Sequence, residues 1–200
     1  MLPDWKPFLD RFSHEILKDE KARARLPAEA VESGWLGFPP ASDEEIKALE
    51  DRLATHLPHS CRSFLVTTDG WRTAGAFIYD LLPASRPCWF RERHQDWIDA
   101  WNEGAATVGE PLPVSDEEYF VCGPEQDCCK FRDEYWQASL AISGVGDSAI
   151  CLLDPLVRTA EGEWEAWFFA NWYPGAARCR SFREMMEAAL ATFVRLRDNP

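Results

Sequence analysis

The spacing of hydrophobic and polar residues predicts a helix at each end of the chain. Near the N-terminus, apolar side chains recur at helical spacing with charged residues between them, and this pattern ends near Lys21. At the other end a helix is expected from Ser181, because Ser181 and Glu184 have the Ser-x-x-Glu spacing of a capping box. The apolar residues of its expected buried face are Phe182, Met185, Met186, Ala189, Leu190, Phe193 and Val194.

Three more helices are predicted between these two. Ser42 and Glu45 form another capping box, and Pro58 ends the helix that it opens. A second helix is expected over residues 60–67 and a third over residues 91–102, where apolar side chains fall on one side.

Segments rich in β-forming residues predict the strands. They cover residues 75–81, 118–122, 136–142, 148–153 and 164–170. A loop that contains glycine separates the last two, so they are expected to pair as a hairpin. The order is helices, then mainly strands with one helix between them, then a helix. We therefore predict an α+β fold with a central antiparallel or mixed sheet and flanking helices, and not a Rossmann-type fold.

The composition indicates an acidic globular protein. The 200 residues carry 21 Lys and Arg against 34 Asp and Glu, a net charge of −13. Residues 1–33 hold six basic and seven acidic side chains, so the excess lies in the rest of the chain. Such a surface repels nucleic acid and anionic membranes and steers a basic partner toward itself. The alternative interpretation is that the acidity only aids solubility.

Three observations favour the cytoplasm. The N-terminus lacks the basic region and apolar run of a signal peptide. No stretch approaches the roughly 20 apolar residues of a membrane helix. The seven Cys form an odd number without a regular framework, which is typical of reduced thiols.

The cysteines are the first candidates for chemistry. Cys122, Cys128 and Cys129 lie within eight residues, but adjacent cysteines are not expected to reach one tetrahedral ion together, and no His is near in sequence. We therefore interpret them as free thiols and expect neither a metal nor a cofactor.

Cys61 is the candidate nucleophile, with His59 and His56 nearby. His59 points to a different helical face, His56 lies across Pro58, and a third orienting group is not evident. We predict that the protein is not an enzyme, and an enzyme that uses Cys61 is the weakest alternative.

The carboxylates show no catalytic pattern. Glu161, Glu163 and Glu165 alternate with other residues, which indicates the solvated face of a strand. The run Asp116-Glu117-Glu118 has no such structural explanation and is the better candidate for partner binding.

Several short motifs follow one another in a fixed order along the chain. They are Gly34-Trp35-Leu36-Gly37-Phe38-Pro39-Pro40-Ala41-Ser42, Leu57-Pro58-His59-Ser60-Cys61-Arg62-Ser63-Phe64-Leu65, Asp69-Gly70-Trp71, Asp116-Glu117-Glu118-Tyr119-Phe120, Gly146-Asp147-Ser148 and residues 164–172. Together they resemble a SUKH domain, the superfamily named for relatives of a yeast cell-wall-synthesis regulator, over about residues 30–195. The chain departs from the family pattern at Cys61, where the family commonly has Tyr, and at Asp69, where it often has Asn.

The resemblance implies a non-catalytic domain of α+β fold. It divides the chain into a helical extension, residues 1–29, and a SUKH-like domain, residues 30–197. Bacterial members are often immunity proteins encoded beside polymorphic or contact-dependent toxins, many of them nucleases, which tend to be basic. The expected partner is thus a basic toxin domain, and neither nucleic acid nor a membrane. The alternative is a regulatory or scaffold module that binds another protein.

The partner should contact acidic surface outside the shared motifs that build the core. The residues that we predict for this contact are Asp116, Glu117, Glu118, Glu125, Asp127, Asp133 and Glu134.

Overall fold

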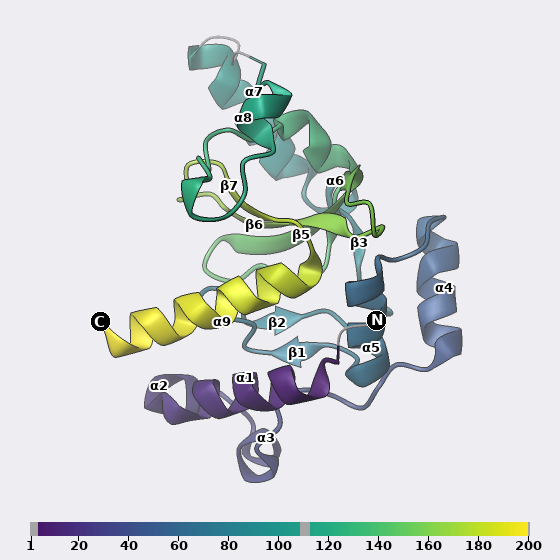
Figure 1. The fold of residues 1–200 in the computed structure, drawn as a ribbon, viewed down its shortest axis with the longest axis vertical. Coiled ribbons are helices and arrows are strands. Elements are labelled where there is room, and N and C mark those ends of the chain that lie inside the picture. The colour runs from purple at the N-terminus through teal and green to yellow at the C-terminus, as the bar shows by residue number, and fades with distance from the viewer. Residues whose placement is uncertain (1–3, 109–112, 200) are drawn as a thin grey trace.

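The fold is built on a five-stranded sheet with helices on both faces (Figure 1). The computed structural model describes residues 4–108 and 113–199. The strand order is β3-β4-β5-β6-β7, and every neighbouring pair is antiparallel. These strands are β3 (Cys88–Trp89), β4 (Leu140–Ala141), β5 (Ala149–Arg158), β6 (Trp164–Ala170) and β7 (Ala176–Cys179). The expected α+β fold and the hairpin of β5 with β6 are confirmed.

Both faces of this sheet are buried, as the alternation of side chains along β5 shows. Ile150 and Leu152 point into one hydrophobic cluster, whereas Cys151 and Leu153 point into another on the opposite face. A sheet covered on both sides reads as a continuous apolar run, which is what residues 149–153 present.

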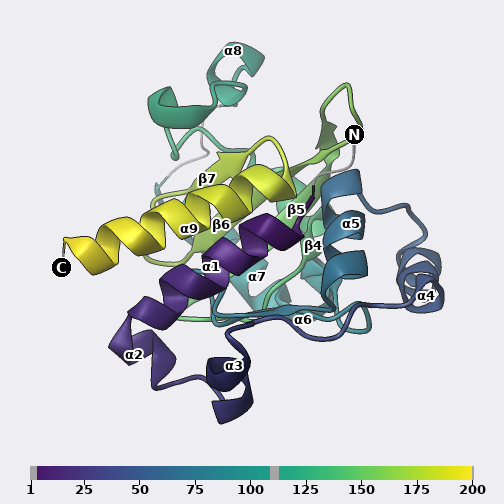
Figure 2. The same cartoon turned by 60° about the horizontal axis from the view of Figure 1, so that its bottom comes forward.

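The larger core lies between the sheet and the helices at the two ends of the chain. In Figures 1 and 2, α1 (Lys6–Lys18) runs beside α9 (Phe182–Asp198). Trp5 joins them, because its ring lies 5.3 Å from both Phe64 and Phe182. The other elements on this side are α2 (Glu20–Arg23), α3 (Ala28–Ser33), α4 (Asp43–Leu53), α5 (His59–Thr67), β1 (Trp71–Arg72) and β2 (Asp80–Leu81). The division at residue 29 stays a prediction.

The second core covers the opposite face of the sheet and is mostly aromatic. Trp136 lies 4.5 Å from Phe169, and Trp101 lies 5.0 Å from Trp136, measured between ring centroids. The elements on this side are α6 (Phe90–Arg93), α7 (Gln95–Val108), α8 (Asp116–Tyr119), η1 (Gly123–Glu125) and η2 (Asp133–Ala138).

The predicted helix starts are accurate where a cap fixes them. Ser42 and Glu45 form both hydrogen bonds of the capping box. At α9, Ser181 accepts from the Glu184 amide at 3.1 Å, but the Glu184 carboxylate accepts from the Arg180 amide instead of completing the box. The N-terminal helix ends at Lys18, three residues early, because the next residue caps the separate helix α2.

Three of the predicted strands were wrong or too long. Residues 118–122 contain no strand, because Ser115 and Glu118 close a capping box that opens α8. Residues 136–142 begin in η2, and only Leu140–Ala141 pairs in the sheet. Of residues 75–81, only Asp80–Leu81 forms a strand.

The expectation of a solvated acidic strand face at residues 161–165 was also wrong. Glu163 accepts the amide of Ser60 at 2.8 Å and so caps the N-terminus of α5. Glu165 is buried and pairs with Arg178 of β7 at 3.1 Å. Only Glu161 of the three is exposed, since β6 is covered on both faces.

Candidate partner-binding site

The predicted contact residues come from one continuous part of the chain, the segment from α8 to η2. We call these seven residues the acidic surface, and it lies at the end of the molecule away from α3 in Figures 1 and 2. Asp133 is half-buried, and the other six are exposed.

Two members of the acidic surface already have basic partners. Asp116 pairs with Arg132, and Glu118 pairs with Lys130 at 2.7 Å. The hydrogen bond from Lys130, together with those from Ser115, holds the pKa of Glu118 below its usual range. These two carboxylates therefore stabilise the surface locally, and part of their charge is already compensated.

Three other members are the free negative charges of this surface. Glu117, Glu125 and Glu134 have exposed side chains without a hydrogen bond or ion pair among the described residues. An exposed carboxylate without a partner is free to pair with a cation brought by another molecule.

A groove of about 840 Å³ opens beside η2, and we call it the acidic groove for its carboxylates, Asp133 and Glu134. Lys130 and Arg132 also line it, but each is already paired with a carboxylate of α8. Trp101 and Phe131 supply its aromatic wall, with ring centroids 5.3 Å apart. Trp101 donates its indole proton to the carboxylate of Asp133 at 2.8 Å, which fixes both side chains. Glu134 also lines the groove, with a free carboxylate. An aromatic face beside carboxylates suits the cationic side chain of Lys or Arg.

Arg132 ties α8 to η2 and so shapes the groove. Its guanidinium donates to the Tyr135 hydroxyl at 3.0 Å and to the Val114 carbonyl at 3.0 Å. It also lies 4.5 Å from the centre of the Tyr119 ring. Because these contacts join three segments, Arg132 is a positioning residue that the sequence pattern did not single out.

Cys61 does not have the environment of a nucleophile. Its side chain is buried, and burial together with Glu163 and Glu50 raises its pKa to about 12, so the thiol stays protonated. His56 pairs with Glu50 at 3.3 Å, and His59 is exposed. A catalytic Cys needs an adjacent base, and neither His provides one here.

Cys128 and Cys129 form a small cluster of possible metal ligands with Asp127. The two Sγ atoms and a carboxylate oxygen of Asp127 all lie within 4.8 Å of one another. A turn closed by the Lys130 amide and the Asp127 carbonyl at 3.0 Å carries these residues, and the expectation that the adjacent cysteines bind no metal stays a prediction.

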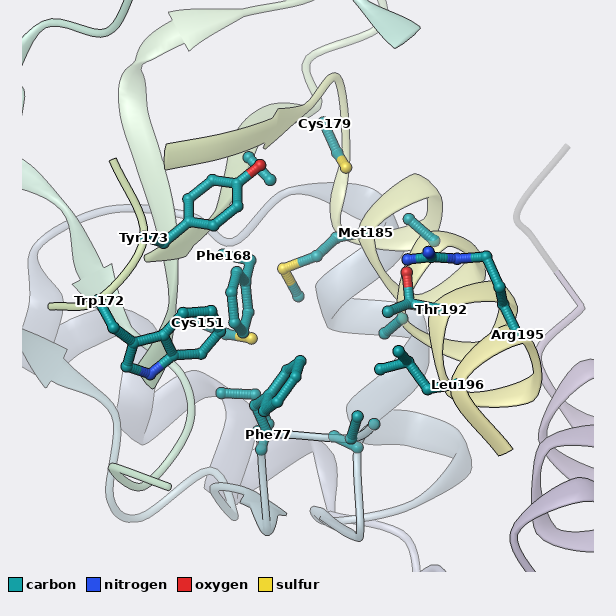
Figure 3. Close-up of a pocket in the computed structure, with 17 residues that line it drawn as sticks. Phe77, Cys151, Phe168, Trp172, Tyr173, Cys179, Met185, Thr192, Arg195 and Leu196 are labelled. Atoms are coloured by element: carbon teal, nitrogen blue, oxygen red, sulfur yellow. The ribbon is translucent and has the colours of Figure 1, made fainter. Parts of the chain in front are cut away.

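A second hollow lies on the opposite face of the sheet and is apolar. It has a volume of about 320 Å³ and opens between α9, the sheet and the segment 74–78 (Figure 3). Phe77, Phe168 and Met185 point into it, and Trp172 stands at its rim with 48% of its surface exposed. Arg195 is the only charged side chain in its described lining. This chemistry does not match a basic partner, so the acidic groove is the better candidate for one.

An α+β sheet covered by helices on both faces, with a groove that combines aromatic rings and carboxylates, is the site that the structure offers to a protein partner. Comparison with known families agrees, because residues 40–188 match the model of the SMI1 / KNR4 family (SUKH-1). The match spans most of the chain, and the protein belongs to this family. Members are generally non-catalytic domains that bind protein partners, consistent with an immunity-protein or regulatory domain.

A search of the curated proteins found no match. In the described part of the chain, none of the helices has both the length and the apolar character needed to cross a membrane.

Proposed function

We propose that this protein is an immunity protein that binds and neutralises a bacterial polymorphic or contact-dependent toxin through its acidic surface. Membership of the SMI1 / KNR4 family supports a protein-binding role. The observation that carries the proposal is that the indole of Trp101 and the free carboxylate of Glu134 both line the acidic groove.

The charge of the chain fits a basic toxin. A net charge of −13 attracts a cationic domain over a distance and speeds the encounter. Toxins that cleave nucleic acid carry basic clefts for their substrate, and an acidic surface laid on such a cleft would block it.

Long-range attraction between charges does not select one partner, so a specific side-chain contact is also needed, and the acidic groove provides a site for it. A Lys or Arg of the toxin would stack on Trp101 or Phe131 and pair with Glu134. The hydrogen bond from Trp101 to Asp133 holds this wall in place before the partner arrives, which lowers the entropic cost of binding.

Purification of the chain with the toxin domain encoded by an adjacent gene tests the proposal. The complex should be tight, should inhibit the toxin's activity, and should weaken as salt is raised. A complex with a housekeeping protein alone would favour the regulatory or scaffold alternative. An activity of the isolated chain that Cys61→Ala abolishes would favour an enzyme.

A further inference from the structure

We propose that Asp127, Cys128 and Cys129 form a binding site for one Zn²⁺ ion. The three residues lie in the loop between η1 and η2, where their ligand atoms are within 4.8 Å of one another. Cys129 is exposed and Cys128 is half-buried, so an ion can reach both sulfur atoms from solvent.

The donor set is one that zinc accepts. Zinc binds Cys sulfur at about 2.3 Å and Asp oxygen at about 2.0 Å, usually in tetrahedral geometry. Neighbouring sulfur ligands of such an ion are about 3.8 Å apart, as the tetrahedral angle and these bond lengths require. A sulfur and an oxygen ligand would be about 3.5 Å apart, so the side chains need to draw together by no more than about 1.3 Å, and a fourth position stays open for water.

Backbone contacts fix the loop that carries the three ligands. The Cys128 carbonyl accepts from the Ala176 amide at 3.1 Å, which docks the loop on the start of β7. Within the loop, the Asp127 carboxylate accepts from the Cys129 amide at 2.9 Å. Gly175 allows this close approach, because a Cβ atom at that position would lie 2.0 Å from the Cys128 carbonyl oxygen.

Groups around the thiols complete the site. Burial, together with the neighbouring thiol of Cys128, raises the pKa of Tyr173, so the phenol stays protonated beside the proposed ligands. In the metal-free chain the Cys129 thiol donates to the Pro174 carbonyl at 3.2 Å, and binding of zinc would release this proton and replace the bond with a Zn–S bond. Burial and the neighbouring Cys128 raise the pKa of Cys129, and a bound cation would reverse this by stabilising both thiolates.

The other five cysteines are buried or half-buried outside this cluster, so they offer control substitutions for a metal-binding test. Cys61, Cys88 and Cys151 are buried, and Cys122 and Cys179 are half-buried without a metal-ligand cluster among the described residues. Cys122→Ser therefore removes one accessible thiol from the same part of the fold and leaves the proposed ligands in place.

Titration of the reduced, full-length chain with Cd²⁺ tests the site, because cadmium–thiolate bonds absorb in the ultraviolet. One equivalent should bind, and Zn²⁺ should displace it. Cys128→Ser and Cys129→Ser should each weaken binding at least about ten-fold, and Asp127→Asn by a smaller factor. Cys122→Ser should bind as the wild type does.

The proposal is overturned if the wild type takes up no more Cd²⁺ or Zn²⁺ than the double variant Cys128→Ser/Cys129→Ser does. It is also overturned if Cys122→Ser weakens binding as much as the ligand variants. Circular dichroism spectra of all variants show whether each is folded. The test uses no toxin, so its failure would leave the proposed function untouched.

Discussion

Tyr119 of α8 donates its hydroxyl proton to the carboxylate of Glu165, a buried residue of β6 that lies 46 positions further along the chain. The same carboxylate accepts from the Trp167 indole at 2.7 Å and pairs with Arg178 at 3.1 Å. Arg178 in turn lies 4.1 Å from the centre of the Tyr119 ring. These contacts connect the acidic surface to the central sheet, so α8 is held by the core and not by its own four residues.

Loss of the Tyr119 hydroxyl should destabilise the protein. Tyr119→Phe keeps the ring but leaves a buried carboxylate one hydrogen bond short, which costs about 1–3 kcal/mol. Urea unfolding measures the change in the free energy of unfolding. Tyr79→Phe is the matched control, because that hydroxyl bonds the exposed Asp147 and its loss should cost less than about 0.5 kcal/mol. Equal effects of the two variants would show that Tyr119 does not hold α8 in this way.

Stability should fall as the pH rises from about 4 to about 7. Burial raises the pKa of Asp154 from its ordinary value of 3.8 to about 7, and the nearby Glu165 adds to this. Between these two values the folded state holds a proton that the unfolded state has released. The free energy of unfolding therefore decreases with pH in this window, by up to about 1.4 kcal/mol per pH unit from this one group.

Asp154→Asn removes that dependence, because an amide does not titrate. Its oxygen can still accept the Leu156 amide, which the Asp154 carboxylate accepts at 2.9 Å. Urea unfolding at several pH values between 4 and 8 should show a flatter profile for this variant than for the wild type. Glu117→Gln, which alters a free exposed carboxylate, should keep the wild-type slope. Parallel profiles for wild type and Asp154→Asn would contradict the assignment.

The loop that bears the two adjacent cysteines should depend on Gly175. Gly175→Ala places a Cβ atom 2.0 Å from the Cys128 carbonyl oxygen at a backbone φ of +108°, so the loop must shift. Gly162→Ala is the matched control, since its φ is +82° but nothing lies within 4 Å of the added atom. The control should lose about 1–2 kcal/mol through the left-handed backbone alone, and Gly175→Ala more, as thermal unfolding measures. A smaller loss at Gly175 would argue against tight docking of the loop on β7.

The sequence predicted correctly those helix starts that are fixed by hydrogen bonds between residues close together in the chain. The capping box at Ser42 and the cap at Ser181 place α4 and α9 correctly, because these bonds join residues three positions apart. The strand expected over residues 118–122 failed for a related reason. Ser115 and Glu118 have the same capping-box spacing, and this local cap determines the structure although residues 118–122 are rich in β-forming side chains.

Residues whose roles depend on distant partners could not be read from the sequence. Glu165 resembles an exposed strand residue until Arg178 of the neighbouring strand is placed beside it. Trp101 and Asp133 are 32 positions apart, so nothing in their local pattern indicates the hydrogen bond that shapes the acidic groove. The acidic residues themselves were visible as a run, but their division into paired and free carboxylates needed the fold.

The affinity of charge-reversed variants for the toxin domain tests the central claim most directly. Glu134→Lys reverses a free charge in the acidic groove, and Glu32→Lys makes the same change on α3 at the opposite end of the molecule (Figure 1). Titration calorimetry at physiological salt should show the first variant binding at least about ten-fold more weakly than the wild type. The second should stay within about two-fold, because long-range attraction changes little with one distant charge. Equal affinities of the two variants would contradict the assignment of the groove as the binding site.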